Sequence, residues 1–113
     1  MSHRFIAFDV AFEFAHQLAP VLLHLRRKDR SLEDQLRRAV ASVVLNISEG
    51  DGKSSLRDQG RYFEIARGSC REARAALRLA AVWGYVDKEM VAELDAIANR
   101  VCALLSKLIS RAR

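Results

Sequence analysis

Hydrophobic residues recur every three or four positions along most of the chain, which is the spacing of amphipathic α-helices. The pattern divides into four segments. The first runs from Asp9, a candidate N-cap, to about Leu25 and contains Pro20, where we expect a kink or a short break. Its apolar face consists of Val10, Phe14, Leu18, Val21, Leu22 and Leu25.

The second segment begins at Ser31, whose hydroxyl is suited to cap a helix, and ends at Gly50, which we expect in a left-handed cap. Its apolar face consists of Leu32, Leu36, Ala39, Val40, Val43 and Ile47. Glu33 and Asp34 lie in its first turn, where acidic side chains are favourable to the helix dipole. Ala41 and Leu45 project away from this stripe, so the helix is expected to be covered on more than one side.

Ser55, followed three residues later by Asp58, resembles a capping box that opens the third segment, and Gly84 is suited to end it. The apolar face of this segment includes Tyr62, Ile65, Ala66, Ala73, Leu77 and Ala80. The fourth segment begins at Asp87 and directs Val91, Leu94, Ile97, Ala98, Val101, Leu105 and Leu108 toward the core. Short turns between the segments predict an all-α, antiparallel up-down four-helix bundle formed by residues 1–113 as a single domain.

Composition supports a helical protein, because half of the 113 residues are hydrophobic and only one is proline. No uninterrupted apolar run reaches the roughly 18 residues of a membrane span, and acids interrupt the first residues where a signal peptide is apolar. We therefore expect a cytoplasmic protein with no membrane contact. Cys70 and Cys102 have no metal-ligand spacing and are expected to be buried thiols.

The stretch LNISEGDGKSS combines a glycosylation sequon at Asn46 with the ending of a phosphate-binding loop, Gly52-Lys53-Ser54. A phosphate-binding loop requires a glycine where Ile47 stands, and it follows a β-strand rather than a helix. The sequon falls in an apolar-periodic helix of a chain with no export signal. We therefore interpret the stretch as a helix end, a tight turn and the next N-cap, and expect no cofactor.

A polar seam lies beside the apolar stripe of the second segment. Gln35, Ser42, Asn46 and Glu49 project into an arc of roughly 60° when each residue is rotated by about 100°. The seam is either ordinary solvated surface or a hydrogen-bonded line that sets the register of a helix interface. Both interpretations remain open from the sequence.

The chain is basic, with 19 Lys and Arg against 14 Asp and Glu and a formal charge of +5. Polyanions such as nucleic acid are therefore plausible partners. Six arginines of the third segment project into an arc of roughly 140° opposite its apolar face. They are Arg57, Arg61, Arg67, Arg71, Arg74 and Arg78, and Lys53 lies in the turn before them.

These arginines are either a solvated charged face or a binding surface for phosphates or for a neighbouring subunit's acids. Arg37 and Arg38 are interpreted differently, because Glu33 and Asp34 precede them by four residues at helical pairing positions. We expect these two arginines to be structural first and phosphate-binding second. The three histidines form no HExxH pair, and no nucleophile elbow is present. No enzyme activity and no metal site are predicted.

The middle of the chain resembles the four-helix-bundle family of proteins encoded within intervening sequences of bacterial large-subunit (23S) ribosomal RNA genes. Accessory proteins of diversity-generating retroelements look like more distant relatives. The resemblance is carried by QLRRAVASVVLNISEGDGKSS, YFEIARGSCREA and WGYV. Its matching positions include Gln35, Arg38, Asn46, Glu49, Gly50, Gly52, Ser55, Gly68, Glu72 and Gly84.

The resemblance implies a bundle that assembles into a homopentameric ring and binds nucleic acid without catalytic activity. Our leading hypothesis is a non-enzymatic oligomer that binds RNA or DNA backbones through the arginines of the third segment. The alternative is an assembly or adaptor module that binds a protein partner, with the arginines at subunit contacts. In that alternative the seam and turn residues, from Gln35 to Ser55, serve the interface.

Overall fold

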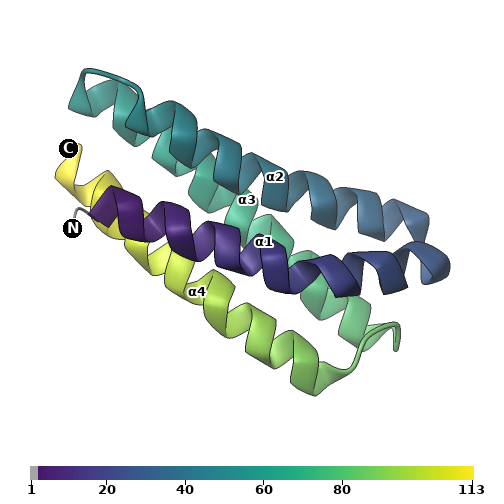
Figure 1. Cartoon of the computed structure of the whole chain (residues 1–113). Coiled ribbons are helices and arrows are strands. Elements are labelled where there is room, and N and C mark those ends of the chain that lie inside the picture. The colour runs from purple at the N-terminus through teal and green to yellow at the C-terminus, as the bar shows by residue number, and fades with distance from the viewer. Residues whose placement is uncertain (1–2) are drawn as a thin grey trace.

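The computed structural model describes residues 3–113, with side chains from Phe5 onward. Its helices are α1 (His3–Lys28), α2 (Arg30–Asp51), α3 (Leu56–Val82) and α4 (Lys88–Arg111), and the described residues contain no strand. Consecutive helices run antiparallel and pack side by side, and α1 packs against α4 to close the bundle (Figure 1). The prediction of an all-α up-down four-helix bundle is confirmed.

The core runs along the axis of the bundle, and each helix contributes one stripe to it. Phe14 of α1, Ile47 of α2, Phe63 of α3 and Leu105 of α4 are among the largest fully buried side chains. The apolar faces predicted for α1, α2 and α4 are buried, apart from two half-buried residues, Leu22 and Ile97. Burial of each large apolar side chain contributes roughly 1.5–3 kcal/mol, so this core is the main source of stability.

The face predicted for α3 is wrong at two positions. Tyr62 is half-buried and Ile65 is 46% exposed, whereas the neighbouring Phe63 is in the core. The buried stripe is Phe63, Ala66, Cys70, Ala73, Leu77 and Ala80, with regular spacings of three and four residues. A residue one position away from this stripe is rotated by about 100° around the helix, which places Tyr62 at the edge of the core.

Helix α1 is longer than predicted, because it begins at His3 rather than at Asp9, and it continues through Pro20 without a break. Ala7 is fully buried, so the apolar stripe already exists before Asp9. Pro20 lacks the N–H that would bond to the preceding turn. Its ring lies at the exposed surface, while Leu18 and Val21 on either side are buried and hold the helix in place.

Both predicted ends of α2 are also wrong. The N-cap is Asp29 rather than Ser31, because the Asp29 carboxylate accepts a hydrogen bond from the Leu32 N–H at 3.0 Å. Gly50 is buried inside the helix, and the C-cap is Gly52, which has a right-handed φ of −78°. The close approach of α3 explains why Gly50 is a glycine, because a Cβ there would lie 2.7 Å from the Phe63 ring.

The turns around α3 follow the prediction. The Ser55 hydroxyl accepts a hydrogen bond from the Asp58 N–H at 3.1 Å and caps the first turn. At the other end Gly84 has a φ of 77°, and the N–H groups of Gly84 and Tyr85 donate to the carbonyls of Ala81 and Ala80. This pair of bonds is a Schellman motif, which glycine favours. Asp87 is the N-cap residue of α4, as predicted, but its side chain makes no capping hydrogen bond.

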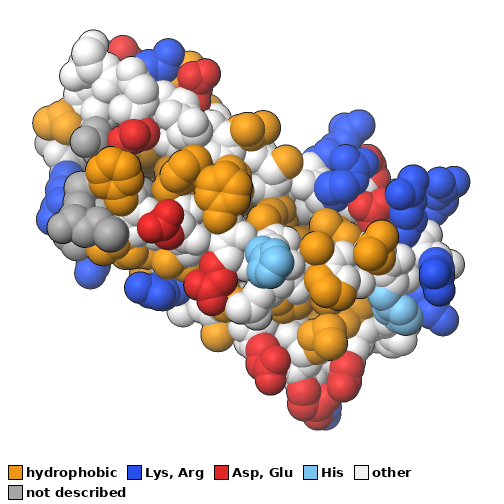
Figure 2. Space-filling view, in the orientation of Figure 1, with side chains coloured by type: hydrophobic (Ala, Val, Ile, Leu, Met, Phe, Trp, Pro, Cys, Tyr) orange, Lys and Arg blue, Asp and Glu red, His pale blue; other side chains and the backbone are white. Residues whose placement is uncertain are grey.

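Helix α1 is apolar on its outer side as well as on its core side. By length and composition alone it is apolar enough to cross a membrane, with a mean hydropathy of 1.4 over its best window. Only 33% of that window is buried in the bundle. Figure 2 shows hydrophobic side chains gathered along α1 and its border with α2. We call this surface, which includes exposed Phe12, Leu23 and Leu45, the apolar face.

A shallow hollow of about 340 Å³ lies within the apolar face, between α1 and α2. Ala15 and Leu22 line it from α1, and Ala41, Val44 and Leu45 line it from α2. Exposed hydrophobic side chains are ordinary when they are scattered singly, but a contiguous group of this kind usually marks an interaction surface. No other described part of the chain packs over the apolar face, which therefore stays exposed in the single chain.

Candidate nucleic-acid interface

The polar seam on α2 is divided between an interface and the solvent. Ser42 and Asn46 are half-buried against α3, where the hydroxyls of Ser42 and Ser69 share a hydrogen bond of 2.7 Å. The Asn46 amide donates to the Ser42 carbonyl at 2.8 Å and to its hydroxyl at 3.0 Å. Gln35 and Glu49 are exposed. The hydrogen-bonded interpretation therefore holds for the middle of the seam and the solvated interpretation for its ends.

The turn between α2 and α3 is held by contacts along the chain. The N–H of Gly52 donates to the Ser48 carbonyl at 3.2 Å, and the Gln59 amide donates to the Lys53 carbonyl at 2.8 Å. The Lys53 ammonium lies over the Tyr62 ring, 5.1 Å from its centre. Gln59 is buried, so its side chain satisfies a carbonyl that the turn leaves free. This arrangement is a structural turn without the strand-loop-helix order of a phosphate-binding loop.

Arg37 and Arg38 form the ion pairs that their spacing predicts. Arg37 contacts Glu33 at 3.1 Å and Asp34 at 2.6 Å, and Arg38 contacts Asp34 at 3.1 Å. Both arginine side chains are more than half exposed, and surface pairs of this kind contribute about 0–1 kcal/mol each. These two arginines are therefore partly neutralised by their own helix.

The sequence predicted that all six arginines of α3 lie opposite the core, and this prediction is wrong for two of them. Arg57, Arg61, Arg71 and Arg78 are exposed, whereas Arg67 and Arg74 are half-buried against α4. Each of these two follows a buried alanine of the core stripe by one position, and this rotation directs its side chain toward the neighbouring helix. We call the surface formed by all six residues the arginine face.

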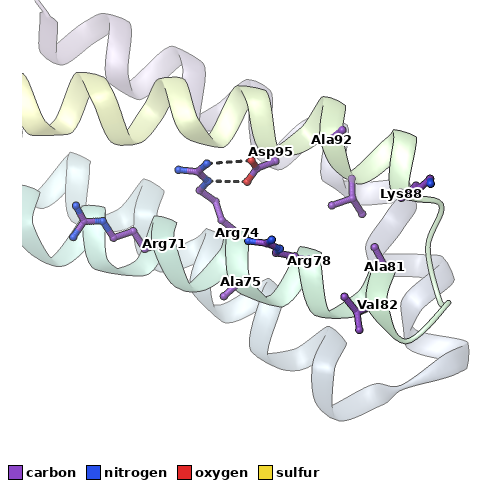
Figure 3. Close-up of a pocket in the computed structure, with 10 residues that line it drawn as sticks. Arg71, Arg74, Ala75, Arg78, Ala81, Val82, Lys88, Ala92 and Asp95 are labelled. Carbon is purple, nitrogen blue, oxygen red and sulfur yellow. Dashed lines mark hydrogen bonds and ion pairs between the residues drawn. The ribbon is translucent and has the colours of Figure 1, made fainter.

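Arg74 is held across the boundary between α3 and α4. Its guanidinium donates to both carboxylate oxygens of Asp95, at 2.7 and 3.1 Å (Figure 3). It also donates to the Asn99 side chain at 3.1 Å. The bidentate bond to Asp95 raises the pKa of Arg74 further above its ordinary value. Arg67 donates to the Ser106 hydroxyl at 3.1 Å. These two arginines fasten α3 to α4.

A groove of about 550 Å³ runs along the arginine face between the second half of α3 and the first half of α4. Figure 3 shows the Arg74–Asp95 pair crossing it, with Arg71 and Arg78 on either side of Arg74 along α3. Its walls are otherwise built mainly from small apolar side chains, including Ala75 and Val82 of α3 and Val91 and Ala92 of α4. Lys88 adds a cation from the beginning of α4. We call this feature the α3–α4 groove.

Three cations of the α3–α4 groove have no carboxylate partner among the residues that the structure describes. They are Arg71, Arg78 and Lys88, all exposed. At the opposite end of the arginine face Glu64 pairs with Arg113 at 3.5 Å and Arg61 lies over the Tyr62 ring at 5.4 Å, while Arg57 and Arg61 likewise have no carboxylate partner among the described residues. The groove therefore presents three cations that no described carboxylate neutralises.

Two thiols lie beneath this part of the arginine face. Cys70 is fully buried on α3 and donates to the Ala98 carbonyl at 3.2 Å, one turn before Cys102 on α4. The neighbouring Cys102 thiol and burial raise the pKa of Cys70 above its ordinary value. The neighbouring Cys70 thiol and the positive charge of Arg74 lower the pKa of Cys102 below its ordinary value. Both cysteines are free thiols, as the sequence predicted.

The two thiols are expected to differ in reactivity. Cys102 is 8% exposed and its pKa is lowered, whereas Cys70 is fully buried, so Cys102 should react with iodoacetamide slowly but before Cys70, which should react only after unfolding. Peptide mapping by mass spectrometry over a time course measures both rates. Changing Arg74 to Gln should slow the reaction at Cys102, and equal rates for the two thiols in the folded protein would contradict the prediction.

Several residues that shape this site were not found from the sequence. Asp95 and Lys88 belong to no local motif, and Ser69 was noted only as part of the resemblance, so each gains its role from a helix that is distant in the chain. One available signal was the position of Asp95 on α4, one residue after core residue Leu94, where a carboxylate faces a neighbouring helix. Among the described residues, no group of three His, Cys, Asp or Glu side chains is arranged to hold a metal ion.

Comparison with known proteins shows a solved structure with the same fold and the family to which the chain belongs. No curated protein matches the chain in sequence. A solved structure of a protein of unknown function from the S23 ribosomal protein family of Bacteroides thetaiotaomicron has the same fold, with a TM-score of 0.89. It is 21% identical, and the match covers 96% of this chain and 99% of that chain. The family model described as 23S rRNA-intervening sequence protein matches residues 3–107, and the chain therefore belongs to this family.

Proposed function

We propose that this protein is a non-enzymatic bundle that binds the backbone of RNA or DNA through the arginine face. The observation that carries the proposal is the concentration of Arg71, Arg78 and Lys88 around one groove, without carboxylate partners among the described residues. Phosphates supply the missing negative charge, because a guanidinium fork matches two phosphate oxygens. Each neutralised phosphate also releases counterions, which favours binding at low salt.

The helix itself supports this role. Arg67 and Arg71, and likewise Arg74 and Arg78, are like-charged pairs one turn apart, and each such pair costs an isolated helix about 0.2–0.5 kcal/mol. The structure relieves the second pair only partly, because Asp95 neutralises Arg74 and leaves Arg78 exposed. A bound phosphate chain would relieve the remaining repulsion. Arg67 and Arg74, by contrast, contribute mainly by holding the two helices together.

The test is a titration with short RNA and DNA, labelled for fluorescence anisotropy, over a series of salt concentrations. Changing Arg71, Arg78 and Lys88 to Gln should weaken binding and reduce the slope of log K against log salt by about 2 to 3, because each lost phosphate contact removes about 0.7–0.9. The matched control changes Arg26, Arg27 and Lys28, which are exposed at the end of α1, to Gln and removes the same charge.

Equal weakening in the control would show that only net charge matters, and salt-insensitive or absent binding in the unmodified protein would refute the proposal. The same variants address the alternative function, in which the arginines make subunit contacts. If the arginines hold subunits together, the groove variant should dissociate in light-scattering measurements. If they bind nucleic acid, its oligomeric state should be unchanged.

We further propose that the protein is a homo-oligomer assembled through the apolar face. The exposed side chains of Phe12, Leu23 and Leu45 and the hollow between α1 and α2 support this assignment, because they provide apolar surface that a second copy would bury. We assign this surface to protein contact rather than to lipid. The five-subunit ring implied by the sequence resemblance is part of this proposal.

A further inference from the structure

The α3–α4 groove has a lining that backbone binding alone does not use. Ala75, Val82 and Ala92 are exposed apolar residues inside a groove whose rim is cationic. A duplex approaching the arginine face presents phosphates outward and keeps its bases stacked inside, so it leaves this lining in contact with water. A ligand that contacts both the cationic rim and the apolar lining must carry an anionic group and a flat apolar group within a few bonds of each other.

The charged side chains of the groove lie in two places: unpaired cations at its rim and the Arg74–Asp95 pair in its interior. Arg71 and Arg78 are seven residues apart on α3, which corresponds to about 10 Å along the helix, and Lys88 lies on the facing helix. Asp95 lies between the two helices and brings carboxylate oxygens into the groove. Because Asp95 is paired with Arg74, the interior of the groove carries no net charge from this pair, and the attraction for phosphates comes from the cations at the rim.

Asp95 also offers a hydrogen-bond acceptor to a group inside the groove. Each carboxylate oxygen accepts one bond from Arg74 and retains a further lone pair. Amino groups of nucleobases donate to carboxylates in this way. The apolar side of an amphipathic helix has no such donor and would leave these further acceptor positions of Asp95 unused, so the groove chemistry favours a base over a protein helix.

We propose that the α3–α4 groove holds one unpaired nucleotide, with its base against the apolar lining and its flanking phosphates on Arg71, Arg78 and Lys88. This inference rests on the proposed function and makes it more specific: the ligand is single-stranded or looped nucleic acid, and duplexes bind only through phosphate contacts. The groove volume of about 550 Å³ lies within the range of about 300–1,000 Å³ that is usual for small-molecule sites.

The experiment compares an adenine-rich RNA strand with the duplex formed by the same strand and its complement, at one salt concentration. The unmodified protein should bind the single strand at least about fivefold more tightly, since accommodating one base contributes about 1–3 kcal/mol. Ala92→Leu fills the groove without removing a cation. This variant should lose the preference for the single strand and retain salt-dependent binding to the duplex.

Ala75→Leu fills the groove from the α3 side and serves as a second variant, and circular dichroism checks that both variants fold. Equal affinity for the two forms in the unmodified protein, or a preference that survives in both folded variants, overturns the inference while leaving backbone binding intact. Absence of salt-dependent binding to either form refutes the proposed function itself. The binding of a labelled acidic amphipathic peptide is measured in parallel. If the groove-filling variants lose affinity for this peptide, and the unmodified protein binds the two RNA forms equally, the groove is assigned to a protein partner.

Discussion

Replacing Gly50 with alanine is expected to lower the free energy of unfolding by about 1–3 kcal/mol, which is the usual cost of overpacking a core. The new Cβ would lie 2.7 Å from Cε1 and 3.0 Å from Cδ1 of Phe63, and 3.2 Å from the Gln59 carbonyl oxygen. The Phe63 ring is itself almost fully buried, so it has little room to move away. Urea unfolding at a fixed protein concentration measures the change.

Gly68 provides a matched control, because it is also a helical glycine, but beyond its own helix backbone no atom lies within 4 Å of an added Cβ. Gly68→Ala should raise the unfolding free energy by about 0.5–1 kcal/mol, since alanine is the better helix former. Combining Gly50→Ala with Phe63→Leu should cost less than the sum of the two single changes, because the smaller side chain makes room for the methyl group. Similar effects of alanine at both glycines would contradict the proposed contact.

Changing Phe12 and Leu45 together to glutamate is expected to dissociate the proposed homo-oligomer into monomers. The two residues are 51% and 66% exposed in the single chain, so the bundle should fold normally. Burying a Leu or Phe side chain contributes about 1.5–3 kcal/mol, and losing two of them weakens each subunit contact on the order of 100-fold or more. Sedimentation or light scattering over a range of protein concentrations measures the mass.

Leu56→Glu is the control for this experiment, because Leu56 is 60% exposed but lies at the beginning of α3, away from the apolar face. An acid in the first turn is favourable to the helix dipole, so this variant should fold and assemble like the unmodified protein. An oligomer that survives the paired change at Phe12 and Leu45 would assign the subunit contact to another surface. A protein that is monomeric without any change would refute the oligomer proposal.

The local signals in the sequence differ in how well they predicted the structure. Ser55 and Gly84 were identified correctly as helix boundaries, because a hydroxyl cap and a left-handed residue satisfy backbone groups within one turn. Gly50 was assigned wrongly as a cap, since the same residue type also serves close packing between helices. The sequence shows only that a glycine is present, and the position of Phe63 on another helix decides which role it has.

In the candidate site, too, the sequence predicted the local pattern, and packing between helices decided the role of each residue. The row of arginines on α3 was evident from the sequence, but all six appeared equivalent there. Packing against α4 divided them, because Arg74 meets Asp95 and Arg67 meets Ser106, while Arg71 and Arg78 remain exposed beside Lys88. No spacing within α3 predicts these partners, which lie 21 and 39 residues away along the chain.

The sequence by itself determined four amphipathic helices, most of the residues in their core stripes, and an excess of positive charge on α3. These properties depend on the helical repeat, which relates residues only one or two turns apart. The tertiary structure alone decided where α3 and α4 leave a groove, which cations there stay unpaired, and that α1 keeps a second apolar side exposed. Such features depend on how each helix is rotated about its axis and placed against its neighbours, and that is settled by packing among distant residues.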